Sequence, residues 1–201
     1  MGIKDDEAIN QISVSDMLNT PEKVKGDEIA VYYASGSIVQ SDIGGMFNQE
    51  RQIVATDVCK DLEALKDDNN VKAVVIRINS GGGDAFASEQ LWHQVMAIKA
   101  KKPVVVSMGD YAASGAYYMS CPANWIVAQP NTLTGSIGIF AVFPDASGLI
   151  TQKLGVKFDE VKTNRNSTFG NLMARPLNNE ESQLLQGYIN RGYNLFRKRV
   201  A

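Results

Sequence analysis

Two short segments, roughly thirty residues apart, carry residue types that together suit acyl-transfer chemistry. Residues 78–83 read Ile-Asn-Ser-Gly-Gly-Gly, and residues 112–116 read Ala-Ala-Ser-Gly-Ala. Three glycines in a row permit positive φ and can point successive backbone N–H groups into one concavity, which suits an oxyanion. A serine hydroxyl beside such donors can act as a nucleophile. The two segments therefore predict two parts of a hydrolytic site, and the third part, a general base, has to be found elsewhere.

Ser114 is the serine of the second segment, and it lies shortly after an apolar run that suits a strand. Its small neighbours Ala113 and Gly115 allow a tight turn into a helix, whose dipole favours developing negative charge. The N–H of the residue after a nucleophile is a natural oxyanion donor. Serine is also a preferred helix N-cap, so a purely structural role for Ser114 stays open.

The glycine run at 81–83 and the turn at 134–138 also have structural explanations. A turn between a strand and a helix uses glycine whether or not it binds an anion, and residues 81–83 match no nucleotide-binding motif. Ser136, within Thr-Gly-Ser-Ile-Gly, can hydrogen-bond a catalytic partner or simply serve the turn. Neither segment decides the function by itself.

The general base is the part that the residues do not supply clearly. His93 is the only histidine, and it lies within a predicted helix, which disfavours a Ser-His-Asp triad. Asp84 and Asp110 flank the two turns and are explained equally well as solvated loop carboxylates. A lysine whose pKa is lowered by burial is the remaining choice, and Lys162, just after a predicted strand, is the best local candidate.

Length and composition describe an ordinary globular domain. The chain has 201 residues, of which 44% are hydrophobic and 21% charged, and its net charge is −2. That length suits one domain, and no basic field points to nucleic acid. No apolar run approaches the roughly 18 residues of a membrane span. Cys59 and Cys121 match no metal-binding pattern, and either two thiols or a disulfide would fit, so they do not fix the compartment.

Strands and helices are predicted to alternate along the chain. Expected strands cover residues 28–33, 71–78, 103–108, 125–129 and 156–161, and expected helices cover 51–67, 88–100, 114–120, 146–154 and 179–199. The β-branched run at 71–78 suits a strand buried on both faces. The alternation predicts an α/β domain with a mostly parallel sheet, in which sites form at the carboxyl ends of strands.

The start of the chain differs in character from the rest. Residues 1–26 are polar and weakly patterned, so we expect a linker or tail there, with one short helix near 15–18. Residues 37–50 contain a Gly-Gly breaker and predict a loop. Residues 27–201 are expected to form the single domain.

Three ordered motifs resemble the signal peptide peptidase A family of serine–lysine peptidases. They are residues 78–89 (INSGGGDAFASE), 102–124 (KPVVVSMGDYAASGAYYMSCPAN) and 131–140 (NTLTGSIGIF), with 22 residues from Ser114 to Ser136. The resemblance covers roughly residues 27–200 and is strongest to the C-terminal half of the long tandem form. It implies the fold of Clp protease and crotonase, with repeated ββα units, a mostly parallel sheet and helices packed outside.

The resemblance also implies roles for individual residues. Ser114 matches the nucleophile of the family, and Gly83 and Gly115 match its oxyanion donors. Gly82 shapes the turn, and Ser136 matches the serine that hydrogen-bonds the catalytic lysine.

Substrate contacts are expected beside these residues. Gly82, Asp84 and Tyr111 are expected to bind an extended, apolar peptide that adds beside a strand edge. Phe86 and Tyr117 also suit such a cleft, although core packing explains the aromatic residues equally well.

The chain departs from the family at the lysine. Single-half members carry it in the segment after the strand that is expected here to end at Val161, and the matching position is Asn166. An asparagine cannot act as the base, and in tandem members the lysine comes from the N-terminal half. We therefore expect the chain to be a fragment of a longer protein that is inactive or weakly active alone. The usual Ser-Pro-Gly-Gly also reads Ser-Gly-Gly-Gly at 80–83.

The resemblance implies a serine endopeptidase with a Ser/Lys dyad that degrades cleaved remnant signal peptides and needs no metal or organic cofactor. Its expected partners are peptide substrates, the N-terminal half of the same protein and further copies in a homo-oligomer, but not nucleic acid. The catalytic part is expected outside the bacterial inner membrane, with the anchor beyond this segment, which by itself would be soluble. Two alternatives stay open: a crotonase-type acyl-CoA enzyme and a non-catalytic half that builds an oligomer.

Overall fold

The main sheet is parallel throughout, and its strand order is β1-β4-β5-β6, with β7 paired to the end of β5. The computed structural model describes residues 26–42 and 51–201, so the expected tail and its short helix at 15–18 lie outside the described residues. The strands of this sheet are β1 (Glu28–Ser35), β4 (Val71–Ser80), β5 (Val104–Ala113), β6 (Trp125–Val127) and β7 (Leu133–Gly135). A smaller parallel pair joins β2 (Ser37–Val39) to β3 (Gln52–Val54). The carboxyl ends of β4 and β5 share one edge of the main sheet, where sites form in folds of this kind.

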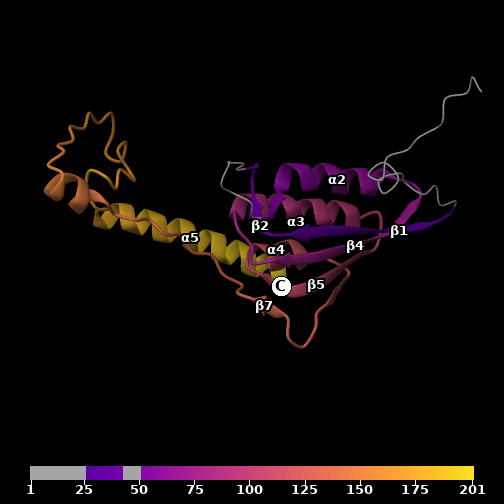
Figure 1. The fold of residues 1–201 in the computed structure, drawn as a ribbon. Coiled ribbons are helices and arrows are strands. Elements are labelled where there is room, and N and C mark those ends of the chain that lie inside the picture. Colours follow the sequence, from indigo (N-terminus) through magenta and orange to yellow (C-terminus); the bar gives the residue numbers. More distant parts are fainter. Residues whose placement is uncertain (1–25, 43–50) are drawn as a thin grey trace, which may run out of the picture.

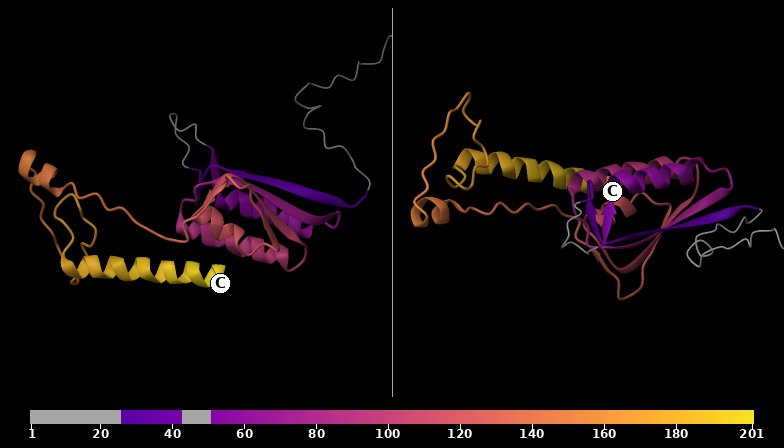
Figure 2. Two further views of the ribbon diagram at one scale, coloured as in Figure 1. Left: turned by 90° about the horizontal axis from the view of Figure 1, so that it is seen from below. Right: turned by 45° about the horizontal axis from the view of Figure 1, so that its top comes forward.

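Helices α2 (Ala55–Asp67) and α3 (Ala85–Lys99) cover one face of the main sheet (Figure 1). The other described helical elements are the short α4 (Gly115–Ser120), the π-helical turn η1 (Gly148–Lys153) and α5 (Asn179–Val200). Helices α2 and α3 lie side by side over the sheet, as Figures 1 and 2 show from different sides. A mostly parallel sheet with helices outside is the arrangement that the sequence predicts.

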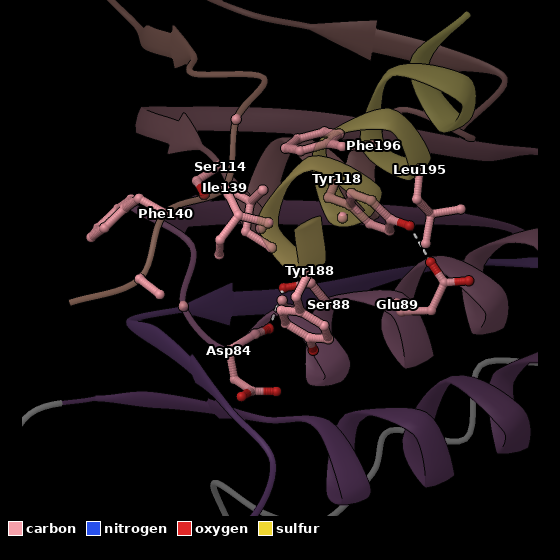
Figure 3. Close-up of a pocket in the computed structure, with 17 residues that line it drawn as sticks. Asp84, Ser88, Glu89, Ser114, Tyr118, Ile139, Phe140, Tyr188, Leu195 and Phe196 are labelled. Atoms are coloured by element: carbon pink, nitrogen blue, oxygen red, sulfur yellow. Dashed lines mark hydrogen bonds between the residues drawn. The ribbon is translucent and has the colours of Figure 1, made fainter. Parts of the chain in front are cut away.

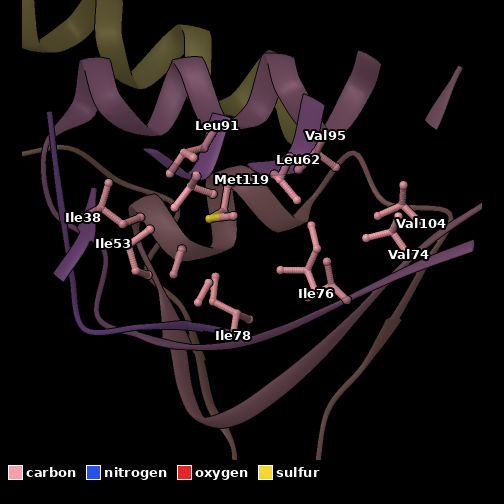
Figure 4. Packing of buried hydrophobic residues seen from close by; sticks show 14 of the residues in the cluster. Ile38, Ile53, Leu62, Val74, Ile76, Ile78, Leu91, Val95, Val104 and Met119 are labelled. Atoms are coloured by element: carbon pink, nitrogen blue, oxygen red, sulfur yellow. The ribbon is translucent and has the colours of Figure 1, made fainter. Parts of the chain in front are cut away.

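The core lies between this face of the sheet and the two helices. Alternate side chains of β4, namely Val74, Ile76 and Ile78, are fully buried against Leu62 of α2 and Leu91 of α3 (Figure 4). Burying a side chain of this size stabilises the folded state by about 1.5–3 kcal/mol relative to leaving it exposed. The core therefore fixes the positions of β4 and β5, and with them the positions of the turns that follow.

The prediction that residues 71–78 are buried on both faces is wrong. Arg77 is exposed on the face away from the helices, and Tyr33, its partner in the β1–β4 register, is 75% exposed. The reason is that the described helices cover one face of the sheet only. Val31, on the same face of β1, is exposed as well.

Four local predictions fail because the presence or absence of a pairing strand overrides the sequence pattern. The expected helix at 51–67 begins with strand β3, because Ile53 pairs with Ile38 of β2. Strand β2 falls within the loop expected at residues 37–50. The turn expected at 134–138 overlaps β7, which pairs with β5. The expected strand at 156–161 is not a strand, and no described strand lies beside it to supply backbone hydrogen bonds.

A long excursion separates β7 from the end of the chain. After β7 the chain runs away from the sheet, and residues 144–178 lie near the N-terminal end of α5, which then leads back (Figures 1 and 2). The returning end of α5 contacts the core through Phe196, whose ring meets Tyr118 edge-on at 4.8 Å between centroids. Among the described helices, none is both long and apolar enough to cross a bilayer.

Helix α5 begins with a strong set of hydrogen bonds. The side chain of Asn178 accepts from the N–H of Glu181, whose carboxylate accepts from the N–H of Asn178 in return, forming a capping box. Both carboxylate oxygens of Glu181 also accept from Arg175, at 2.8 Å each. The Arg175 guanidinium and the Asn178 N–H lower the pKa of Glu181 to about 2.

Acid should therefore weaken the start of α5 through Glu181. Because its pKa in the folded chain lies below the ordinary value of 4.5, its stabilising effect is complete above that pH and is lost as the pH falls toward 2. We expect Glu181→Gln to lower the thermal midpoint at pH 6 and to lose much less of it between pH 5 and 2.5 than the parent chain does, as followed by circular dichroism. Glu180→Gln removes the same charge from a neighbouring exposed pair with Arg165 and should keep the parental acid profile. Equal acid profiles for all three proteins would contradict this assignment.

Candidate functional site

Ser114 occupies a strained turn between β5 and α4. Its φ is 52° and its ψ is −120°, values that non-glycine residues rarely adopt. Its N–H donates to the carbonyl oxygen of Gly135 at 3.0 Å, which ties the turn to the end of β7. Its hydroxyl makes no capping hydrogen bond to α4, so the alternative of a simple helix cap is wrong. A sharp strand-to-helix turn of this kind is the geometry that exposes the nucleophilic oxygen of α/β-hydrolases.

The glycine turn after β4 packs directly on the turn that holds Ser114. A Cβ on Gly82, whose φ is 93°, would lie 2.5 Å from the backbone nitrogen of Gly115 and 2.9 Å from the carbonyl oxygen of Ala113. A Cβ on Gly115 would lie 2.3 Å from Oγ of Ser88 and 3.3 Å from the backbone nitrogen of Gly83. Backbone thus meets backbone, with no room for side chains between the two turns.

Two N–H groups are left free beside Ser114. The glycine turn is held by hydrogen bonds from the N–H of Ile38 to the oxygen of Gly82 and from the N–H of Asp84 to the oxygen of Ile38, both 2.9 Å long. Neither of these bonds uses the N–H of Gly83. No described residue accepts a hydrogen bond from that N–H or from the N–H of Gly115. The site therefore has two uncommitted donors close to a serine hydroxyl, the arrangement that an oxyanion requires.

An apolar hollow of about 400 Å³ opens beside Ser114. Ser114 lines it together with Ile139 and Phe140, which follow β7 (Figure 3). Gly83 and Gly115 line it as well. Helix α5 forms the remaining wall with the apolar side chains Tyr188, Ile189, Leu195 and Phe196. A hollow of this size and character fits an apolar side chain of a ligand.

A polar cluster fastens α5 to the rest of the site. The Glu89 carboxylate accepts hydrogen bonds from the Tyr118 hydroxyl, one turn beyond Ser114, and from the Arg199 guanidinium near the end of α5. The same guanidinium lies 3.6 Å from the centre of the Trp92 ring. Burial, together with the hydrogen bond to Glu89, raises the pKa of Tyr118 to about 12, so its hydroxyl remains a donor at neutral pH.

Sequence reasoning did not single out this cluster. Tyr118 and Arg199 lie 29 and 110 residues from Glu89, so no local spacing connects them. The one available signal is the apolar stripe of the last predicted helix, which shows that a face of α5 must be buried but not against what.

The predicted site residues differ in how the structure places them. Ser136 directly follows Gly135, whose carbonyl binds the Ser114 N–H, and it too has a positive φ of 53°. Asp84 lines the hollow, but one of its carboxylate oxygens caps α3 by accepting from the N–H of Ala87 at 2.7 Å. Tyr111 lies outside the hollow, 40% exposed, with its ring against Gly81.

The candidate bases, and the position at which the family resemblance predicts a lysine, lie elsewhere. Lys162 and Asn166 belong to the excursion beyond the far end of α5, and Lys162 forms an ion pair with Glu160 at 2.9 Å. His93 is exposed on α3. In the described part of the chain, the residues that line the hollow include neither lysine nor histidine. Cys59 and Cys121 are free thiols, so the disulfide alternative is wrong.

Two family profiles match this chain; the first defines its fold class and the second its family. The sequence profile of Clp protease matches residues 26–132, in agreement with the parallel sheet and its outer helices, so the predicted Clp protease-like fold class is confirmed. The profile of peptidase family S49 matches residues 96–201, more than half of the chain. The chain belongs to peptidase family S49, which confirms the resemblance seen in the three motifs.

Curated relatives agree with this family. The chain is 35% identical over 175 residues to the chloroplastic serine protease SPPA of Arabidopsis thaliana, covering 87% of this chain and 26% of that protein. It is 39% identical over 181 residues to Protease 4 of Haemophilus influenzae, covering 89% of this chain and 27% of that protein. The chain thus spans about a quarter of the length of these two relatives.

A solved structure of ClpP1 from Listeria monocytogenes is also similar. It is 19% identical, with a TM-score of 0.41, over 86% of this chain and 78% of that one. The assignment of the fold rests on the sheet and on the two profiles rather than on this likeness.

The contact between the two turns predicts a sharp difference between adjacent glycines. Gly82→Ala should destabilise the chain by roughly 1–3 kcal/mol or more, because its φ is positive and its Cβ would press on the backbone of the opposite turn. Gly81→Ala should be neutral or slightly stabilising, because its Cβ would meet only the Tyr111 ring at an ordinary 3.6 Å. Urea denaturation measures both, and equal stabilities would mean that the two turns do not meet as described.

Proposed function

We propose that this chain supplies the nucleophile and the oxyanion hole of a serine peptidase whose general base is a lysine from another part of the protein. The observation that carries the proposal is the position of Ser114, held at a φ of 52° beside the N–H groups of Gly83 and Gly115, from which no described residue accepts a hydrogen bond. Membership of a peptidase family and the names of the relatives support the same reaction class.

The chemistry follows from the geometry of the turn. Oγ of Ser114 attacks the carbonyl carbon of the peptide bond while its proton passes to the base. The carbonyl oxygen becomes an oxyanion that accepts from the N–H groups of Gly83 and Gly115. The tetrahedral intermediate then collapses, the C–N bond breaks and the amine leaves with the proton held by the base. A water molecule releases the acyl group from Ser114 by the same steps.

The base is proposed to be a lysine from the N-terminal half of a tandem protein. The hollow beside Ser114 is lined by neither lysine nor histidine within the described residues, and the position expected for a local lysine is Asn166. The chain also spans only about a quarter of its two relatives, 26% and 27%. In this proposal Ser136 orients the lysine, because it follows the residue that binds the backbone of Ser114.

The proposed substrate is an extended apolar peptide, such as a signal peptide left after its release from a preprotein. The apolar walls of the hollow support this class, and one relative, from Enterococcus faecium, is named as a putative signal peptide peptidase. We place the reaction at the outer side of a bacterial inner membrane, in a homo-oligomer. Gly82 holds the turn on which the peptide would lie, while Asp84 and Tyr111 would flank it.

The alternative of a crotonase-type acyl-CoA enzyme fits the site less well. Such enzymes also hold an oxyanion with backbone N–H groups but do not need a nucleophilic serine. Here a serine occupies a strained turn without capping the following helix, and strain of about 1–3 kcal/mol persists where function requires it.

Hydrolysis of a fluorogenic apolar peptide tests the proposal. We expect no activity from this chain alone, activity from the chain mixed with the N-terminal half of its parent protein, and at least about a thousandfold loss in that mixture after Ser114→Ala. Lys162→Ala is the matched control, and it should leave the mixture unchanged because Lys162 pairs with Glu160 away from the hollow.

Each contrary result identifies a different error. Hydrolysis by the chain alone that is lost in both Ser114→Ala and Lys162→Ala would make Lys162 the base. Hydrolysis by the mixture that survives Ser114→Ala would refute Ser114 as the nucleophile. Silence of the intact full-length protein toward peptides and serine-reactive probes would favour the non-catalytic role.

A further inference from the structure

Two glycines lie inside α5, although glycine in the interior of a helix lowers its stability. Gly187 and Gly192 both lie in its interior. A glycine there destabilises a helix by roughly 0.5–1 kcal/mol relative to alanine, because the unfolded chain has more freedom to lose. A glycine in such a place therefore calls for a packing reason, and the two positions differ in this respect.

Gly192 has such a reason, and Gly187 does not. A Cβ on Gly192 would lie 2.9 Å from Cδ1 of Ile139, closer than side chains pack, and 3.6 Å from Cγ2 of the same residue. A Cβ on Gly187 would meet only a flexible guanidinium nitrogen of Arg191, at 3.9 Å. The gap left by the missing side chain of Gly192 is thus filled by Ile139, which belongs to the segment after β7.

Both partners of this contact line the hollow beside Ser114. Gly192 lies in the middle of the face that α5 turns toward the hollow, between Tyr188 and Ile189 on one side and Leu195 and Phe196 on the other. These positions recur at helical spacing, so they form one stripe. Ile139 stands opposite this stripe and close to Ser114 (Figure 3).

We propose that Gly192 determines substrate specificity, because its missing side chain lets Ile139 withdraw and so leaves the hollow deep enough for a large apolar side chain of the substrate. This inference rests on the proposed function, since it places in the hollow the side chain on the amino side of the cleaved bond. When the carbonyl of the cleaved bond accepts from the N–H groups of Gly83 and Gly115, the side chain of the same substrate residue lies next to Ser114, where the hollow opens.

A methyl group at position 192 would act through Ile139 rather than through the backbone. The nearest atom is the end of a flexible side chain, so it can move aside at little cost, and the chain should fold normally. The side of Ile139 toward α5 would then be occupied, so Cδ1 would turn into the hollow. The result is a shallower hollow that still admits a small side chain.

Peptide binding tests this without requiring the base. Three fluorescent peptides that differ only in a C-terminal Ala, Leu or Phe present a carboxylate to the two N–H groups and a graded side chain to the hollow. Fluorescence anisotropy with this chain should give affinities that rise from Ala to Leu and Phe by on the order of tenfold, the gain expected for burying a few more carbons. Gly192→Ala should remove most of that gain and leave the Ala peptide nearly unchanged.

Two further variants separate a filled hollow from a general change in α5. Gly187→Ala is the matched control, because it makes the same change in the same helix, and it should keep the parental preference. Ile139→Val removes Cδ1, the one atom that a Cβ at 192 would crowd, so the double variant Gly192→Ala/Ile139→Val should recover most of the preference for Leu and Phe. Both alanine variants should raise the thermal midpoint, which shows that any lost binding is not unfolding.

The inference is overturned if the parent chain binds none of the peptides or all three equally. It is also overturned if Gly192→Ala weakens all three by the same factor, or if Ile139→Val does not restore the preference. The hydrolysis experiment with Ser114→Ala decides the proposed function separately. Hydrolysis that depends on Ser114, combined with equal binding of the three peptides, would refute the role of Gly192 and leave the peptidase intact.

Discussion

The contact of two backbones at Gly82 and Gly115 is the constraint on which the candidate site depends. Each turn follows a central strand of the parallel sheet, and the hydrophobic core fixes the positions of both strands. The turns can approach this closely only because neither carries a side chain at the point of contact. That approach brings the N–H groups of Gly83 and Gly115, which bind no described acceptor, next to Ser114. A single methyl group between the turns would separate the donors from the serine.

The strain at Ser114 follows from the same arrangement. The turn is held from two sides, by the glycine turn after β4 and by the hydrogen bond from Ser114 to Gly135 at the end of β7. Residues in rare backbone conformations persist where their surroundings determine them this completely. The hydroxyl consequently faces the hollow instead of capping α4, so one feature accounts for both the unusual φ and the exposed oxygen.

The remaining wall of the site comes from the opposite end of the sequence. Helix α5 reaches the site only after the long excursion of residues 136–178, and its last turns are fastened by Phe196 against Tyr118 and by Arg199 against Glu89. Tyr118 belongs to the short helix that begins just after Ser114. Ser114 and the hollow are therefore linked through one aromatic contact and one carboxylate. The same excursion carries Lys162 and Asn166 away from Ser114, so neither lines the hollow beside it (Figure 1).

The sequence by itself determined the alternation of strands and helices, the two glycine-containing turns and the place of Ser114 after a buried strand. These features are local, since they depend on β-branched runs, helical spacing and the freedom of glycine. It also identified the family, because three motifs in order are specific. The tertiary structure alone decided which residues meet. Nothing local shows that Gly82 touches Gly115, that Glu89 joins Tyr118 to Arg199, or that Gly192 accommodates Ile139, because these partners are far apart in the chain. For the same reason no described strand lies beside residues 156–161, and residues 52–54 form a strand with β2 although their pattern is helical. A strand requires a pairing partner that its own sequence does not specify.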